Sequence, residues 1–232
     1  MIDLSRRDGH MLRIGHRGAA ALAPENSLEA IALAVELGCD LVEFDVHQVD
    51  GALVVVHDRP AARGDLPTLD TVLAALARTG AGLHLDLKAI GAEAAVADEL
   101  RRHGLLGRTV VSSFRRGTLR ALHAVEPGVR LGRTYPQDRT GLVRRPAFQP
   151  PARAIVRGLR RALPRFVDRL LAGSRATAAV LYWEVISEAV VARCHARGAP
   201  VLAWTVDDPD VLPWLDRAGV DGVVTNDPRI FR

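Results

Sequence analysis

Residues 14–58 read IGHRGAAALAPENSLEAIALAVELGCDLVEFDVHQVDGALVVVHD and place charged and polar side chains at the ends of short apolar runs. Glu43 and Asp45 are separated by one residue, so on a β-strand both carboxylates point to the same side. Two carboxylates on one face repel each other unless a proton or a cation lies between them, and a divalent metal ion with oxygen ligands is the simplest solution. Together with His16 and His57, this pattern indicates metal-assisted acid–base chemistry on an anion such as a phosphate ester.

Outward from this stretch, short apolar strands alternate with amphipathic helices along the whole chain. The expected strands cover residues 11–15, 41–46, 83–88, 109–113, 129–133, 178–182, 200–205 and 222–225. The expected helices between them cover residues 26–37, 68–78, 92–103, 117–125, 187–197 and 209–217. This α/β alternation predicts a closed (β/α)8 barrel that forms one domain over residues 1–232. A doubly wound open sheet is the alternative, but no GxGxxG pattern follows the first strand.

Local signals add detail to this prediction. The turn at Asp50-Gly51 predicts a β-hairpin after the second strand, with a short extra strand over residues 53–57. Asn26 is expected to cap the first helix, with Glu29 three residues later as a variant of the capping box. In a barrel of this kind the functional residues lie at the C-terminal ends of the strands, where the candidate residues of this chain also fall.

The bulk composition indicates a soluble globular protein. Apolar residues make up 48% of the 232 residues, and no apolar run approaches the roughly 18–20 residues that a membrane span needs. The two cysteines, Cys39 and Cys194, lie far apart without CxxC spacing, which suits a reducing compartment. Residues 1–13 contain no apolar stretch typical of a signal peptide, so we expect a cytoplasmic location.

Positive charge is concentrated in one segment. Ten arginines and a single acid lie between Arg139 and Arg175, although the net charge of the whole chain is only +4. The remainder is therefore acidic, which argues against nucleic-acid binding. We expect residues 134–177 to be a basic helical insertion after the fifth strand of the barrel, with an amphipathic helix over 152–171 that is kinked at Pro164.

Two interpretations of the basic helix remain open. We hypothesise that residues 152–171 rest on an anionic membrane as a peripheral contact and deliver a lipid-tailed diester to the barrel. A solvated or partner-binding face is the alternative, because charged helix faces are commonly of this kind.

The motifs and their order resemble the glycerophosphodiester phosphodiesterase family. The similar segments are IGHRG (14–18), PENS (24–27), GCDLVEFDV (38–46), DG (50–51), VVHD (55–58), LPTL (66–69), DLK (86–88), SSF (112–114), AWTV (203–206) and DGVVTNDP (221–228). The resemblance implies a TIM barrel that hydrolyses glycerophosphodiesters to an alcohol and glycerol 3-phosphate. It also implies one divalent cation, Mg²⁺ or Ca²⁺, as the cofactor, and a small-molecule or lysolipid diester as the substrate.

The same resemblance assigns roles to the charged residues. Glu43 and Asp45 are expected to bind the metal, with Asp86 as the third protein ligand. His16 is expected to act as the base and His57 as the general acid. The leaving alcohol needs a proton, which a histidine can supply. The attacking group is either water or the neighbouring glycerol hydroxyl, and the sequence leaves both open.

Three further residues complete the expected site. The resemblance implies that Arg17 and Lys88, the only lysine of the chain, hold phosphate oxygens and that Trp204 walls the site. A phosphodiester anion resists nucleophiles, so its charge must be neutralised before attack. His84, on the strand that carries Asp86, is interpreted as a packing residue.

The chain departs from the family pattern in three places. The third metal ligand is usually glutamate, whereas Asp86 is one methylene shorter. Only 29 positions separate His57 from Asp86, so the small subdomain that often covers the glycerol end is truncated. Asp207 stands where the family commonly has asparagine.

These departures define a second hypothesis for the function. In it, the protein is a catalytically weakened barrel that binds lipid or phosphate, although the intact pair of His16 and His57 argues against this. A sugar-phosphate isomerase barrel would need a glycine-rich phosphate loop near the last strands, which residues 225–228 do not supply.

Overall fold

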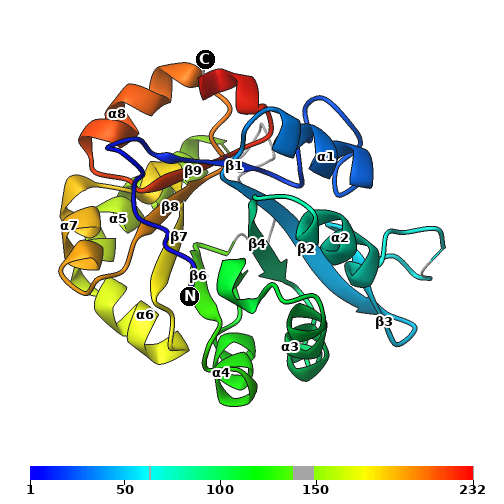
Figure 1. Ribbon diagram of the computed structural model, residues 1–232. Helices are drawn as coiled ribbons and strands as arrows, with labels where there is room; N and C mark the ends of the chain where they lie inside the picture. Colours follow the sequence, from blue (N-terminus) through cyan, green and yellow to red (C-terminus); the bar gives the residue numbers. More distant parts are fainter. Residues whose placement is uncertain (63, 138–148, 232) are drawn as a thin grey trace.

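A closed parallel barrel forms the centre of the computed structural model, which describes residues 1–62, 64–137 and 149–231 (Figure 1). Within these residues, the eight parallel strands are β1 (Leu12–Gly15), β2 (Leu41–Val49), β4 (Gly82–Leu87), β5 (Thr109–Ser113), β6 (Arg130–Tyr135), β7 (Ala178–Tyr182), β8 (Val201–Trp204) and β9 (Gly222–Thr225). Strand β1 pairs with β9 on one side and with β2 on the other, which closes the sheet.

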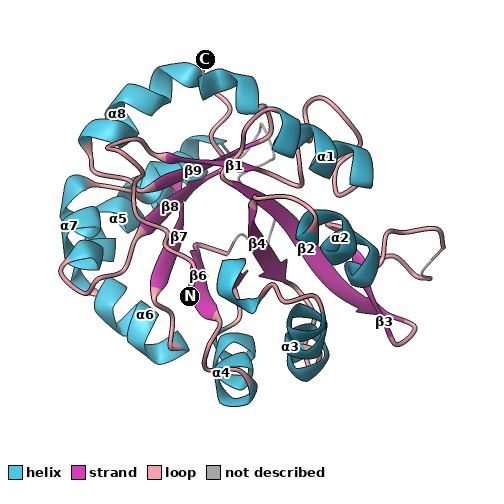
Figure 2. Ribbon diagram, in the orientation of Figure 1, coloured by secondary structure: helices cyan, strands magenta, loops and turns pink. Residues whose placement is uncertain are grey.

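Helices lie outside the strands and cover the barrel (Figure 2). The α-helices are α1 (Leu28–Glu36), α2 (Leu69–Ala77), α3 (Glu93–Arg102), α4 (Arg116–Val125), α5 (Gln149–Ala162), α6 (Val167–Ser174), α7 (Glu188–His195) and α8 (Leu212–Arg217). Short 3-10 helices are η1 (Leu106–Arg108), η4 (Leu163–Arg165), η5 (Trp183–Val185), η6 (Pro209–Val211) and η7 (Pro228–Phe231). The predicted (β/α)8 TIM barrel is confirmed.

The predicted hairpin is present. Strand β3 (Ala52–Val55) runs antiparallel to β2, with Val46 opposite Val55 and Val49 opposite Ala52. Asp50 and Gly51 connect the two strands with φ angles of 51° and 78°. A two-residue hairpin turn of this type needs positive φ at both positions, which Asp-Gly tolerates.

Along β2, the side chains that point into the barrel change from apolar in the core to charged at the mouth. A buried apolar layer inside the barrel consists of Leu12, Ile14, Leu41, Val110, Val180, Leu202 and Val224, packed with Ile2 and Leu4 of the N-terminal segment. Because strand side chains alternate between two faces, the inward residue that follows Leu41 is Glu43, and then Asp45. The intervening Val42, Phe44 and Val46 belong to the core under the helices.

The N-cap of the first helix lies one residue later than expected. Ser27 is its N-cap, and the Ser27 hydroxyl accepts a hydrogen bond from the backbone N–H of Ala30 at 3.0 Å. The prediction that Asn26 caps this helix is wrong. Asn26 has a left-handed backbone with φ of 60° and is buried, and its amide points toward Asp45 instead of the helix start.

The basic segment forms two helices rather than one kinked helix. Helix α5 ends at Ala162, the 3-10 turn η4 contains Pro164, and α6 begins at Val167. Proline cannot donate the backbone hydrogen bond that would continue α5, which explains the break. Of the predicted basic insertion, residues 138–148 lie outside the described residues. No helix in the described part of the chain has both the length and the apolar character to span a bilayer.

Gly18 packs against α1 with no room for a side chain. Its φ is 84°, its backbone N–H donates to the carbonyl of Glu43, and an added Cβ would lie 2.4 Å from the carbonyl carbon of Ala30. Gly38 has a similar φ of 78° but open space around the corresponding position. Substitution of Gly38 therefore measures the effect of backbone strain alone, and substitution of Gly18 measures strain together with steric clash.

Gly18→Ala is expected to lower the free energy of unfolding by about 3 kcal/mol or more, because left-handed strain adds to overpacking. Gly38→Ala carries only the strain and should cost about 1–2 kcal/mol. Urea unfolding of both variants measures the difference. Equal losses would show that the loop after β1 moves away from α1 without cost.

Candidate active site

All eight residues predicted for the site line one pocket of about 690 Å³. They are His16, Arg17, Glu43, Asp45, His57, Asp86, Lys88 and Trp204. His16 follows the last residue of β1, Lys88 follows β4, and Trp204 is the last residue of β8. The pocket therefore opens at the C-terminal ends of the barrel strands.

Three carboxylates form the base of this pocket. Asp45 of β2 lies opposite Asp86 of β4 in the strand register, with Glu43 two residues before Asp45 on the same face. One oxygen of each lies within 4.8 Å of the others, and the three residues are only 2–6% exposed. Burial, followed by repulsion from Asp45 and Asp86, raises the pKa of Glu43 well above its ordinary value.

Two positive side chains neutralise part of this charge. Lys88 Nζ donates to Asp86 and lies 3.1 Å from Asp45 Oδ1, and Arg17 Nε lies 3.3 Å from Asp45 Oδ2. Burial alone would raise the pKa of Asp45, but Lys88 and Arg17 hold it below its ordinary value. The Arg17 guanidinium also donates to Glu25 at 2.5 Å, which fixes its position at the pocket edge.

Lys88 and Arg17 leave the third carboxylate, Glu43, without a cationic partner in the described part of the chain. Within the described residues its carboxylate accepts from the backbone N–H of Arg17 at 2.8 Å and lies 3.9 Å from His16 Nε2, but it pairs with no lysine or arginine. Three oxygen-donor side chains with surplus negative charge match the ligands that Mg²⁺ and Ca²⁺ prefer. The cluster of Glu43, Asp45 and Asp86 therefore fits a divalent metal ion.

Hydrogen bonds fix the tautomer of His16. Asp207 accepts from the backbone N–H and the side-chain Nδ2 of Asn226, at 2.8 and 2.7 Å. Because a carboxylate only accepts, this arrangement leaves Oδ1 of Asn226 facing His16 Nδ1, at 2.7 Å. His16 Nδ1 must then carry the proton, and Nε2 keeps its lone pair. Burial, with a smaller effect of Arg17, lowers the pKa of His16 to about 4, so the ring is neutral at pH 7.

His57 reaches the pocket from the segment after the hairpin. Its Nδ1 lies 3.1 Å from a carboxylate oxygen of the exposed Asp58, and its backbone carbonyl accepts a hydrogen bond from His47 Nε2 at 3.0 Å. His47 lies on β2, so this bond ties the His57 segment to the strand that carries two of the three carboxylates.

A hydrogen-bond chain on the neighbouring strands holds Asp86. Ser112 donates to Asp86 Oδ1 at 2.7 Å, and His84 Nε2 lies 2.9 Å from the same hydroxyl. The serine proton is used by Asp86, so His84 Nε2 is the donor to Ser112. His84 Nδ1 has no partner among the described residues, and burial lowers the pKa of His84 to about 4. His84, interpreted from the sequence as packing, thus also lines the pocket and supports Asp86 through Ser112.

Aromatic rings form another wall of the pocket. Trp204 packs edge-on against Phe114 and in a tilted arrangement against Tyr182, with ring centroids 5.7 and 5.6 Å apart. Its Nε1 donates to the carbonyl of Val180 at 3.1 Å, so the indole is fixed in place. Val156 of α5 lines the same pocket. The site therefore combines a charged base with an apolar wall.

The sequence analysis missed several residues that hold the site. Asn26 binds Asp45 twice: its Nδ2 donates to Oδ2 and its Oδ1 accepts from the backbone N–H, both at 3.1 Å. Asn226 and Asp207 orient His16, and Ser112 orients Asp86. Asn26 and Asn226 belong to the motifs PENS and DGVVTNDP, which already indicated that these positions matter. Their hydrogen-bond partners could not be predicted because they lie far away in the sequence.

Removal of the Asn226 amide should release His16. Asn226→Leu keeps the side-chain size but deletes the acceptor, so we expect His16 to populate both neutral tautomers. Two-dimensional ¹⁵N–¹H NMR of the imidazole rings measures this. Asp208→Ala is the matched control, because Asp208 bonds to Asp210 rather than to Asn226. Unchanged His16 nitrogen shifts in Asn226→Leu would contradict the assigned hydrogen bond.

Comparison with known proteins places this chain in a family. The sequence profile of the glycerophosphoryl diester phosphodiesterase family matches residues 16–82 and 83–230. Among curated relatives, a glycerophosphodiester phosphodiesterase of Caldanaerobacter subterraneus subsp. tengcongensis is 26% identical in an alignment that covers 94% of each chain. A probable glycerophosphodiester phosphodiesterase 2 of Mycobacterium tuberculosis is 28% identical and covers 97% of this chain and 91% of its own.

Solved structures share the fold. A putative glycerophosphoryl diester phosphodiesterase from Silicibacter pomeroyi superposes with a TM-score of 0.79 at 23% identity, covering 98% of this chain and 93% of its own. A phosphodiesterase from Oleispira antarctica, solved with the product sn-glycerol-3-phosphate, gives a TM-score of 0.74 at 24% identity and covers 94% of each chain.

Proposed function

We propose that this chain, which belongs to the glycerophosphoryl diester phosphodiesterase family, hydrolyses a glycerophosphodiester to an alcohol and glycerol 3-phosphate. The protein is a phosphoric diester hydrolase, and residues 1–232 act as one domain. One observation carries the proposal: a buried cluster of three carboxylates shares a pocket with His16, whose Nε2 is free to accept a proton.

The charged base of the pocket prepares the substrate. Glu43, Asp45 and Asp86 would hold one divalent cation, Mg²⁺ or Ca²⁺, which when bound supplies positive charge to the phosphate. Arg17 and Lys88 bind the phosphate oxygens and keep the diester against this base. Both cations are already ordered by the carboxylates, so little reorganisation opposes substrate binding.

The two histidines move the protons. His16 accepts a proton at Nε2 from the attacking hydroxyl. Attack by water gives glycerol 3-phosphate directly, whereas attack by the neighbouring glycerol hydroxyl gives a cyclic phosphate that water then opens to glycerol 3-phosphate. The Asn226 carbonyl stabilises the imidazolium that forms, because it already binds Nδ1–H. His57 donates a proton to the leaving alcohol oxygen as the P–O bond breaks. The neutral state and fixed tautomer of His16 support an active enzyme over a binding module that has lost catalysis.

The apolar wall supports a substrate larger than glycerophosphocholine. Trp204, Phe114 and Tyr182 offer aromatic surface, and Val156 extends it toward α5. The connection between His57 and Asp86 spans only 29 positions and is too short to form a large subdomain above the site. We therefore propose that lysophospholipids are substrates as well, with Trp204 against the apolar part of the lipid.

His16→Ala and His57→Ala are each expected to lower kcat by about 10²–10⁴-fold, the usual contribution of general acid–base catalysis. Choline and glycerol 3-phosphate released from glycerophosphocholine and lysophosphatidylcholine measure the activity. EDTA should abolish it, and Mg²⁺ or Ca²⁺ should restore it. His10→Ala, an exposed histidine outside the pocket, is the matched control. Activity that survives both EDTA and the two substitutions would rule out this mechanism.

The basic helices support a peripheral contact with anionic membranes. Arg153, Arg157, Arg160, Arg165 and Arg169 are exposed on the segment from α5 to α6. Because α5 also contributes to the pocket wall, this surface lies beside the proposed lipid entrance. We propose a cytoplasmic protein that binds the inner membrane surface, which the free, buried Cys39 and Cys194 also suit.

Co-sedimentation with vesicles tests the membrane contact. Vesicles that contain phosphatidylglycerol should bind the protein, and binding should weaken as salt is raised from 0.1 M because exposed charges are then screened. Neutral phosphatidylcholine vesicles are the control and should bind little. Equal binding to both kinds of vesicle, or no binding, would remove the proposed contact.

A further inference from the structure

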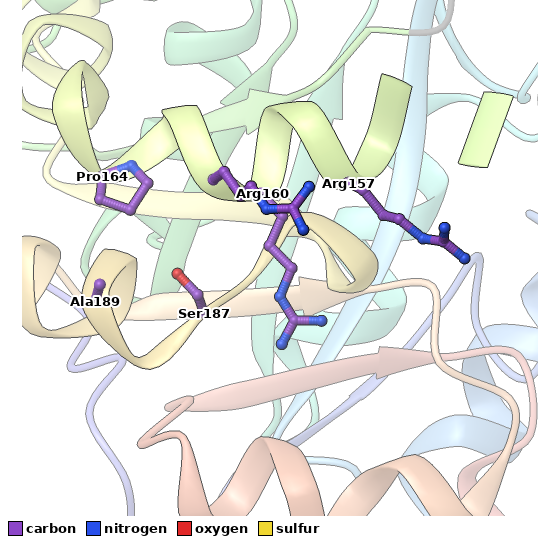
Figure 3. Close-up of a pocket in the computed structure, with 6 residues that line it drawn as sticks. Arg157, Arg160, Pro164, Ser187 and Ala189 are labelled. Atoms are coloured by element: carbon purple, nitrogen blue, oxygen red, sulfur yellow. The ribbon is translucent and has the colours of Figure 1, made fainter. Parts of the chain in front are cut away.

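A second pocket lies on the outer side of helix α5, away from the carboxylate cluster. Its volume is about 450 Å³. It is lined by Arg157, Arg160, Arg161, Pro164, Ser187 and Ala189, and is called the arginine pocket below. In Figure 3, Arg157, Arg160 and Pro164 come from the α5 side, and Ser187 and Ala189 come from the start of α7.

The arginine pocket concentrates positive charge without an acidic partner. Its lining contains three guanidinium groups and no carboxylate, and none of the three forms an ion pair with the described residues. Other exposed arginines behave differently: Arg7 pairs with Asp40, and Arg193 pairs with Asp168. Cations that converge without a counter-charge provide a site for an anion.

The helix geometry places these charges on one face. Arg157, Arg160 and Arg161 are spaced three and four residues apart, so their side chains are neighbours on α5. Val156 of α5 and Leu163 of η4 are buried in the core and border this face next to Arg160. Like charges at this spacing repel by a few tenths of a kcal/mol, and a bound anion would convert this repulsion into attraction.

Neighbouring groups order the pocket. The Arg160 guanidinium lies 4.8 Å from the ring centroid of Trp214, which restricts its position and leaves its N–H edge available. Across the pocket, the hydroxyl of Ser187 accepts from the backbone N–H of Val190, so its own proton can be donated to a ligand. Guanidinium and hydroxyl donors together match the oxygens of a phosphate group.

The arginine pocket and the catalytic pocket meet along α5. Val156 lines the catalytic pocket, and the next residue, Arg157, lines the arginine pocket. Helix α5 also exposes Ile155, whose relative exposure is 62%. Ile155 lies two residues before Arg157, so it points to the opposite side of α5 from the arginine pocket, and the pocket itself presents only basic and polar groups to a ligand.

We propose that the arginine pocket binds the phosphate of an anionic phospholipid headgroup and thereby holds the catalytic entrance against the membrane. This inference rests on the proposed membrane contact and assigns that contact to one pocket. A lipid is favoured over a free phosphate ion because Arg153, Arg165 and Arg169 add exposed positive charge along the same segment, which matches an anionic surface better than a single ion.

Two triple variants with equal loss of charge test the inference. Arg157→Gln, Arg160→Gln and Arg161→Gln empty the pocket of cations. Arg153→Gln, Arg165→Gln and Arg169→Gln remove three exposed arginines of the same segment that do not line it. Partitioning onto phosphatidylcholine vesicles with and without phosphatidylglycerol is measured for both and for the wild type.

The pocket variant should lose at least about tenfold more binding to anionic vesicles than the control variant, because charge-assisted hydrogen bonds in a pocket exceed the effect of charge alone. Equal losses of vesicle binding in the two variants would overturn the assignment of the membrane contact to the arginine pocket. If the wild type does not bind anionic vesicles, the proposed membrane contact itself is overturned. Glycerophosphocholine hydrolysis should be unchanged in both variants, which separates the result from failure of the enzymatic proposal.

A calorimetric titration with inorganic phosphate distinguishes the source of the ligand. The lipid assignment predicts weaker binding of free phosphate than of the headgroup at a vesicle surface. Phosphate binding that is lost only in the pocket variant, together with equal vesicle binding by both variants, would overturn the lipid assignment. Arg157→Glu alone, at an exposed position, is the second variant if the triple variant unfolds, and it should also weaken vesicle binding.

Discussion

The burial of three carboxylates next to two cations is the constraint on which the rest of the site depends. Glu43, Asp45 and Asp86 lie in the barrel interior, where unpaired charge is costly. Lys88 and Arg17 neutralise Asp45 and Asp86, whereas Glu43 forms no ion pair with a lysine or arginine of the described residues and burial raises its pKa. In the proposed mechanism, a divalent cation and an anionic diester would together balance the remaining negative charge of the cluster.

Hydrogen bonds from neighbouring residues fix the orientation of the side chains in this site. Asp207 fixes Asn226, which in turn fixes the tautomer of His16. Ser112 holds the short side chain of Asp86 from the neighbouring strand. Each bond joins residues from different barrel strands or loops, so the fold must be closed before the reactive atoms are in place. The rigid barrel thus supplies orientation that flexible side chains would otherwise lose.

Sequence periodicity predicted the barrel and the shared face of Glu43 and Asp45 because strand alternation is local, whereas the site roles of Asp86, Arg17, Lys88 and Trp204 were implied by the resemblance to the family. Leu41, Glu43 and Asp45 all point into the barrel because every second residue of a strand lies on the same face. The partners across strands were not predicted, since the register of Asp86 with Ser112 depends on closure of the sheet. Asn26 was misassigned as a helix cap because asparagine is common at that position. Its left-handed backbone turns the amide toward Asp45, and the neighbouring sequence does not reveal this conformation.

Anomalous X-ray scattering from a crystal grown with Mn²⁺ tests the central claim most directly. Manganese prefers the same oxygen ligands as magnesium, and its position can be located without assumptions about the reaction. One strong peak among the carboxylates of Glu43, Asp45 and Asp86 is the predicted result. A fully occupied peak elsewhere, or none in this cluster at saturating Mn²⁺, would contradict the account.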